Sequence, residues 1–138
     1  MSDMLAFMVQ EEQLARDVYA LAIDEYGDRV FVNINRAESN HMAELQVLLD
    51  RYEVADPTAN AVPGGFADDE LTAMYADLSA QVGTDRAGAI NAGIAVETAD
   101  IADLKDALKL AAPADVTTVL ENLLAGSERH LAAFQRNA

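Results

Sequence analysis

Residues 33–53 read NINRAESNHMAELQVLLDRYE, and this stretch decides the fold. Its apolar side chains recur at intervals of three and four residues, which is the period of one face of an α-helix. Two ionisable residues fall on the same line as the apolar ones. The residues on this line are Ile34, Glu38, His41, Leu45 and Leu48. The stretch therefore predicts an amphipathic helix that turns a carboxylate and an imidazole toward the protein core.

The rest of the chain has the same helical period, and residues that break helices lie between the periodic segments. The expected helices span residues 3–26, 33–53, 69–82, 84–112 and 115–135. Ser2 and Asp115 are predicted to cap helix N-termini, and Gly27 and Pro113 are predicted to end helices. No segment of useful length alternates between apolar and polar residues, so strands are not expected.

The lengths of the connections predict how the helices are arranged. Short turns join the first two long helices and the last two, so each pair forms an antiparallel hairpin. The link between the pairs is about 30 residues long and carries the short helix over 69–82. We expect an all-α four-helix bundle, with this long crossover between the second and third long helices. The length favours a single domain over residues 1–138.

The composition excludes several classes of function. There are 24 acidic and 9 basic residues, and the net charge of −15 opposes binding to nucleic acid or to an anionic membrane surface. The absence of cysteine excludes disulfides, thiolate zinc sites and cysteine nucleophiles. No apolar run approaches the roughly 20 residues that span a bilayer. The first residues lack the features of a signal peptide, which predicts a cytoplasmic protein, or a secreted one if the chain is a trimmed mature form.

Every long helix carries an ionisable residue on its apolar line. These residues are Glu12, Glu38, His41, Glu97 and His130, and Asp100 lies one turn after Glu97 on the flank of its line. Glu97 and His130 are nearly equidistant from Pro113, so an antiparallel pair of helices brings them to one level. Glu12 and Glu38 are separated from Gly27 by unequal numbers of residues, so a simple antiparallel pair would leave them at different levels. An extended connection over 28–32 would reduce this difference in level. The helices can therefore direct these side chains to one region.

Carboxylates buried together without partners cost several kcal/mol each, and a bound dication removes that cost. The i, i+3 spacing of Glu38 and His41 projects both side chains from one face of the helix toward one point. Carboxylate oxygens together with imidazole suit iron or manganese, and zinc would also fit. The competing interpretation is an ordinary helix surface, on which Glu12 pairs with Arg16 and Asp100 belongs to a solvated face.

Four strings occur in order along the chain. They are EEQLARDVY over 11–19, AESNHM over 37–42, VETADIADL over 96–104 and ENLLAGSERHLAAF over 121–134. Together they resemble the ferritin-like superfamily, and within it the rubrerythrin-type proteins. The resemblance implies that the metal ligands are Glu12, Glu38, His41, Glu97, His130 and, less directly, Asp100. The last string departs from the family pattern, because Ser127 stands where a second bridging glutamate is usual, and Asp100 would have to compensate.

The resemblance also implies an activity. A ferritin-like bundle would hold a non-haem di-iron or iron/manganese centre that acts on dioxygen or peroxide as an oxidase or peroxidase. Its electrons would come from an external donor, since the chain has no cysteine for an iron–thiolate centre. The alternatives are a non-catalytic bundle with a structural or vestigial metal site, and a protein that handles or stores iron. A homodimer is favoured over a cage, because nothing in the sequence specifies cage contacts.

Overall fold

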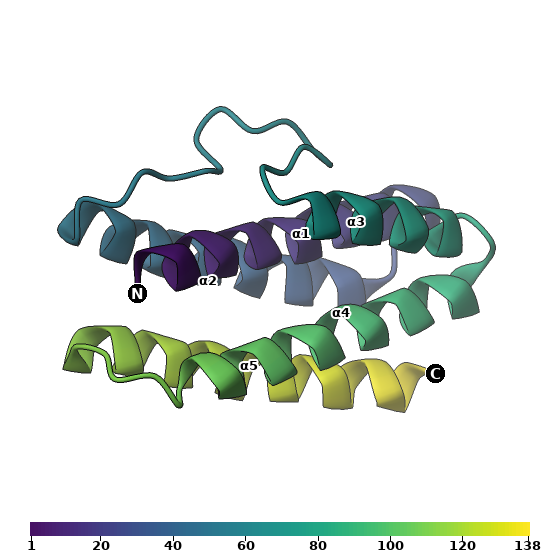
Figure 1. The fold of residues 1–138 in the computed structure, drawn as a ribbon. Coiled ribbons are helices and arrows are strands. Elements are labelled where there is room, and N and C mark those ends of the chain that lie inside the picture. The colour runs from purple at the N-terminus through teal and green to yellow at the C-terminus, as the bar shows by residue number, and fades with distance from the viewer.

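The structure, a computed structural model, describes residues 1–138 and contains five α-helices and no strand. They are α1 (Ser2–Tyr26), α2 (Arg29–Arg51), α3 (Asp69–Val82), α4 (Arg86–Ala107) and α5 (Ala114–Asn137). The antiparallel pair α1 and α2 faces the antiparallel pair α4 and α5, and α3 lies on the outside against α1 and α4 (Figure 1). The predicted all-α bundle of four long helices with a fifth in the crossover is confirmed.

The ends of α1 and α2 follow the sequence only in part. Gly27 ends α1 as predicted, because its backbone is left-handed, with φ at 64°, a conformation that glycine adopts without strain. Ser2 is not the N-cap, since it lies inside the helix and Met1 takes the cap position. The extended connection expected over 28–32 is wrong, because α2 already begins at Arg29. Only Gly27 and Asp28 therefore join the two helices.

The ends of α4 and α5 also differ from the prediction. α4 ends at Ala107, well before Pro113, and tight turns fill the connection. A proline restricts only the residue directly before it, so Pro113 does not end this helix, and the backbone leaves the helix at Leu108 instead. Asp115 lies in the first turn of α5 and does not cap it. Its carboxylate instead accepts hydrogen bonds from Arg51 and Tyr52 at the far end of α2, each at 2.6 Å.

The bundle interior consists of two apolar clusters with a polar layer between them. One cluster contains Tyr19, Phe31 and Phe134, and lies toward the α1–α2 turn. The other contains Leu5 and Leu45, and lies toward the α4–α5 turn. Each of the four long helices contributes to both clusters, and its ionisable core residues fall between the two contributions. The sequence of each helix therefore places its polar core residues at mid-height.

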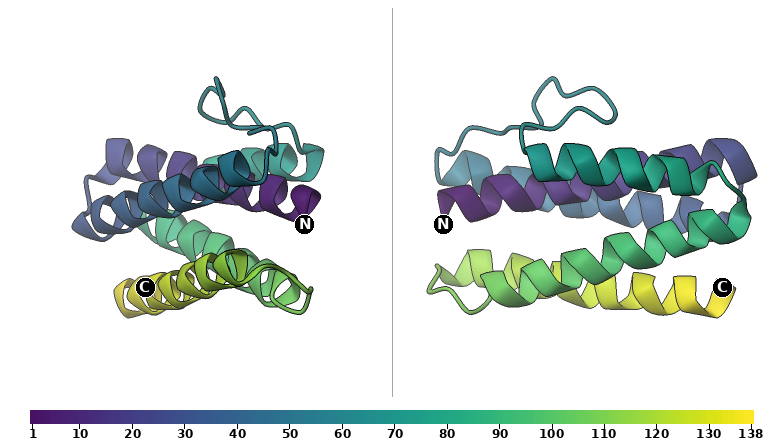
Figure 2. Two further views of the ribbon diagram at one scale, coloured as in Figure 1. Left: turned by 90° about the vertical axis from the view of Figure 1, so that its left-hand side faces the viewer. Right: turned by 45° about the vertical axis from the view of Figure 1, so that its right-hand side comes forward.

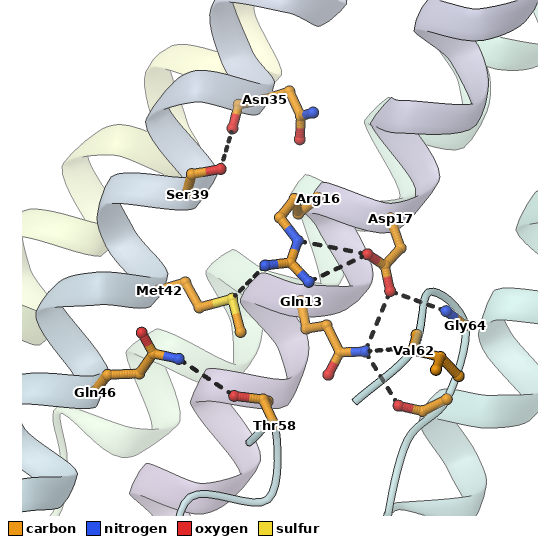
Figure 3. A network of polar contacts seen from close by, with 11 residues as sticks. Gln13, Arg16, Asp17, Asn35, Ser39, Met42, Gln46, Thr58, Val62 and Gly64 are labelled. Carbon is orange, nitrogen blue, oxygen red and sulfur yellow. Dashed lines mark hydrogen bonds and ion pairs between the residues drawn. The ribbon is translucent and has the colours of Figure 1, made fainter. Parts of the chain in front are cut away.

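The segment before α3 is held against α1 by polar contacts. Gln13 and Asp17 of α1 are both buried, and the Asp17 carboxylate accepts hydrogen bonds from the backbone N–H of Gly64 and the side-chain amide of Gln13, at 2.9 and 3.2 Å (Figure 3). Figure 2 shows this segment looping over the α1–α2 side of the bundle, away from α4 and α5. Asp68 caps α3 by accepting from the N–H of Leu71. None of the five helices is long and apolar enough to cross a membrane.

Candidate metal centre

The polar layer gathers the ionisable residues that the sequence places on the helix lines. We call five of them the central cluster: Glu12 from α1, Glu38 and His41 from α2, Glu97 from α4 and His130 from α5. The three glutamates are each 1% exposed and the two histidines 8% exposed. Such deep burial is rare for glutamate, which normally stays in water unless it is paired. All four long helices therefore bring ionisable side chains to one buried place.

Glu38 lies at the middle of the central cluster. Its Oε2 is 3.3 Å from Nδ1 of His41, and its Oε1 is 2.9 Å from Nδ1 of His130. The Nδ1 atom of His41 also lies 3.7 Å from Glu12, and that of His130 lies 3.3 Å from Glu97. Two sets of donor atoms result, Glu12 with Glu38 and His41, and Glu38 with Glu97 and His130. Within each set the donor atoms lie within 4.8 Å of one another, and Glu38 belongs to both.

No arginine or lysine pairs with the carboxylates of the central cluster, whose ion-pair partners are His41 and His130 alone. Both side-chain oxygens of Glu12 and the Oε2 atom of Glu97 are buried without a hydrogen-bond partner. Burial raises the pKa of Glu12 and of Glu38 well above the usual range, and the charge of Glu38 raises that of Glu12 further. A buried, unpartnered carboxylate costs several kcal/mol as an anion, so it holds a proton or receives a cation. Three carboxylates and two imidazoles fit a hard metal ion, and the orphaned oxygens are free to ligate it.

Tyr19 supports the central cluster from its apolar side. Its hydroxyl donates a hydrogen bond of 2.8 Å to Oε1 of Glu97, and its ring packs against Phe31 and Phe134. Burial, followed by the charge of Glu97, raises the pKa of this phenol well above its usual range. The hydroxyl therefore stays protonated and fixes the orientation of the Glu97 carboxylate.

Asp100 lies beside the central cluster and belongs to neither set of donor atoms. It is 5% exposed, its Oδ2 accepts a hydrogen bond of 2.6 Å from the Ser127 hydroxyl, and its Oδ1 has no partner. Burial, followed by the charge of Glu12, raises its pKa well above the usual range. The alternative that Asp100 belongs to a solvated face is wrong. The Ser127 hydroxyl of α5 thus holds a carboxylate from α4.

The ordinary surface interpretation of α1 also fails. Arg16 does not pair with Glu12, because its guanidinium lies 3.5 Å from the Asp17 carboxylate and 3.3 Å from the sulfur of Met42 (Figure 3). Glu12 faces the interior, while Arg16 is turned toward α2 and the crossover segment. A spacing of four residues brings two side chains to one face of a helix, but neighbouring helices decide which partner each one finds.

Two residues near the central cluster carry no signal in the sequence. Glu11 is 5% exposed, and burial together with the charges of Asp100 and Asp103 raises its pKa to about 11. Gly126 of α5 lies against the His41 ring, and a Cβ atom placed there would be 2.5 Å from its Cε1. Glu11 lies one residue off the apolar line of α1, and its burial depends on the neighbouring helices. Only the packed structure reveals the burial of Glu11 and the contact of Gly126 with His41.

Comparison with known proteins places the chain in a family. A model described as "Uncharacterized protein domain (DUF2202)" matches residues 1–138. The chain is 34% identical over 129 residues to the uncharacterized protein MJ0754 of Methanocaldococcus jannaschii, and the match covers 94% of this chain and 70% of that protein. The crystal structure of hypothetical protein MJ0754 matches with a TM-score of 0.94 at 33% identity, covering 98% of this chain and 77% of that one. The chain therefore belongs to the DUF2202 family of protein domains.

Proposed function

We propose that the protein is a ferritin-like metalloprotein that binds two iron or manganese ions in the central cluster and acts on peroxide or dioxygen. The observation that carries the proposal is the position of Glu38, whose two carboxylate oxygens each face a different histidine. A single buried carboxylate shared by two sets of donor atoms is an arrangement that suits a pair of ions. The orphaned oxygens of Glu12 and Glu97 support the same conclusion.

The residues divide naturally between the two ions. Glu12 and His41 would hold one ion, Glu97 and His130 the other, and Glu38 would serve both. Helix α2 supplies two of these ligands from adjacent turns, because residues three apart lie on one face. Asp100 is adjacent to this set, and the Ser127 hydroxyl holds one of its oxygens in place. It would compensate for the charge of the ions or complete the coordination of one of them.

A bound pair of iron or manganese ions would supply one-electron redox steps toward dioxygen or peroxide. The chain supplies the surroundings. Two apolar clusters above and below the polar layer keep bulk water from the glutamates, while the histidine edges remain slightly exposed. Tyr19 keeps Glu97 oriented through its hydrogen bond. Reduction of one peroxide to two waters consumes two electrons and two protons, and an external donor would deliver the electrons, since the chain has no cysteine for an iron–thiolate centre.

A metal titration of the metal-depleted protein tests the proposal. We expect calorimetry with Mn²⁺, and with Fe²⁺ under anaerobic conditions, to give two equivalents per chain. Glu38→Gln should remove most of the binding at both positions, because it removes the shared carboxylate. Glu121→Gln makes the same chemical change on the exposed face of α5 and should leave binding unchanged. Failure of the wild-type protein to bind either ion, or undiminished binding by Glu38→Gln, would contradict the proposal.

A second measurement tests the activity. The iron-loaded or manganese-loaded protein, supplied with a reductant, should consume peroxide or dioxygen, and Glu38→Gln should not. Metal binding that raises the melting temperature without any turnover would instead support a structural site, because a ligand that binds only the folded state stabilises it. Elemental analysis of the protein purified from its native host identifies which metal it carries there.

A further inference from the structure

The His41 ring connects the central cluster to the surface between α2 and α5. Its Nδ1 atom faces the carboxylates of Glu38 and Glu12, at 3.3 and 3.7 Å, so its Nε2 atom points away from them. A Cβ atom placed on Gly126 of α5 would lie 2.7 Å from this Nε2 atom. Helix α3 packs against α1 and α4 and contacts neither α2 nor α5, so no further helix covers this side of the bundle (Figure 1). The His41 side chain accordingly keeps 11% of its surface exposed.

The Nε2 atom of His41 has no acceptor within the chain. A histidine that binds a metal through one ring nitrogen almost always donates the proton of the other to a carboxylate, a carbonyl or water. Because Nδ1 of His41 belongs to the donor atoms of the central cluster, a metal ion bound there leaves the ring proton on Nε2. The hydrogen bond of this ring in the structure involves Nδ1 alone. The acceptor for the Nε2 proton therefore comes from outside the chain.

Arg129 places a positive charge beside this nitrogen. It lies three residues after Gly126 on α5, and long side chains on a helix point back toward its N-terminus. One guanidinium nitrogen lies 3.8 Å from the Gly126 Cβ position that is 2.7 Å from Nε2 of His41. No ion pair in the structure involves Arg129. No acid lies within its helical reach either, since the residues three and four positions away are Ala125, Gly126, Ala132 and Ala133.

We propose that the guanidinium of Arg129 and the Nε2–H group of His41 together bind a small inorganic oxyanion at the surface between α2 and α5. The inference rests on the proposed function, because the metal ion on Nδ1 keeps the ring proton on Nε2. An oxyanion has enough oxygens to accept from both groups, and the hydrogen bond from guanidinium is strengthened by charge. An anionic acceptor on the outer nitrogen raises the basicity of the inner one, so the bound oxyanion strengthens His41 as a metal ligand. The site thus regulates metal affinity from the surface.

The alternative is that water alone accepts the Nε2 proton and that Arg129 is solvated without a ligand. The two cases differ in their response to an oxyanion at constant ionic strength. Screening by salt acts on all exposed charges and depends on the ionic strength alone. A bound oxyanion changes one imidazole nitrogen, and the change saturates.

NMR of the full chain labelled with ¹⁵N-histidine tests the site, because the chain has only two histidines. Zn²⁺, a diamagnetic ion that carboxylates and imidazoles bind, is added first to the metal-depleted protein and should shift the Nδ1 resonances. Sodium sulfate then replaces sodium chloride at constant ionic strength. We expect the His41 Nε2 resonance to shift and to saturate, with half-saturation on the order of millimolar, since the net charge of −15 opposes anions.

Two variants on α5 show whether Arg129 holds the anion. Arg129→Gln should weaken the apparent affinity for sulfate about tenfold, because it removes the charged donor. The matched control is Arg136→Gln, which removes another exposed charge from the same helix and should alter that affinity by less than about twofold. Both residues are exposed, so both variants should fold and keep the Nδ1 shifts caused by Zn²⁺.

The two ring nitrogens separate failure of the anion site from failure of the metal centre. If Zn²⁺ shifts Nδ1 but sulfate gives no saturable shift of the His41 Nε2 resonance, the anion site is overturned and the metal centre stands. Equal sulfate affinity in Arg129→Gln and the wild-type protein would also overturn the site. An Nδ1 resonance that does not respond to Zn²⁺ would contradict both, because no metal would then keep the ring proton on Nε2.

Discussion

Gly126→Ala is the substitution that tests how closely α5 holds His41. A Cβ atom at this position would lie 2.5 Å from Cε1 and 2.7 Å from Nε2 of the His41 ring. Ordinary van der Waals contact begins at 3.4 Å, so the ring would have to move by about 1 Å. The Nδ1 atom, which is bonded to this Cε1, is the ring atom that faces Glu12 and Glu38. Relief of the clash therefore moves Nδ1 out of its position against the two carboxylates.

The magnitude follows from two opposing effects. Overpacking of a buried contact typically costs about 1–3 kcal/mol. Alanine in place of glycine within a helix returns about 0.5–1 kcal/mol, so the metal-free variant should lose at most about 2.5 kcal/mol of unfolding free energy. Metal binding should suffer more, because residues that orient a ligand typically change metal affinity by about 10–100-fold when they are mutated. The variant should thus fold and yet bind Mn²⁺ weakly.

Chemical denaturation and calorimetric Mn²⁺ titration measure the two quantities. The control is Gly93→Ala, where a Cβ atom would lie 2.7 Å from the Phe134 ring in an apolar cluster. This control should lose a similar amount of stability and keep most of its metal affinity. Unchanged metal affinity in Gly126→Ala, or an equal loss of affinity in the control, would refute the assigned role of Gly126.

Three further predictions concern the metal-free protein. Its stability should fall as the pH rises above about 4.5, because Glu12 and Glu38 keep protons in the folded state that the unfolded chain releases. Urea denaturation between pH 5 and pH 8 measures this, and rising stability over this range would contradict it. Tyr19→Phe should cost about 1–3 kcal/mol of unfolding free energy, because the buried Glu97 loses its donor, and an unchanged denaturation midpoint would argue against that hydrogen bond. Asp17→Asn should loosen the crossover segment over 55–67, and limited proteolysis should then cut there faster than in the wild-type protein.

The sequence predicts most of the fold because breakers and helical periodicity are local signals. Gly27 ends α1 as expected, and the α3 boundaries at Asp69 and Val82 follow directly from the residues around them. The errors in the predicted helix ends occur where a contact between residues far apart in the sequence determines the local structure. Asp115 has the chemistry of an N-cap, but Arg51 and Tyr52 lie close enough to take its carboxylate. A sequence pattern cannot show which partner a side chain meets after the helices pack.

Some residues of the candidate site can likewise be predicted from the sequence, and others cannot. Helical spacing on each apolar line identifies Glu38 and His41 as residues that share one face, and the structure places them 3.3 Å apart. Their use as metal ligands remains a prediction. Glu11 is missed because its burial depends on a neighbouring helix, and Gly126 because the absence of a side chain carries no periodic signal. Residues that act through their surroundings are visible only in the folded structure.

Anomalous diffraction from crystals of the Mn²⁺-loaded protein tests the central claim most directly. We predict two anomalous peaks inside the bundle, one between Glu12 and His41 and the other between Glu97 and His130, with the Glu38 carboxylate in contact with both. A map without a peak among these five side chains would contradict a metal centre in the central cluster. A single peak would contradict the sharing of Glu38 between two ions.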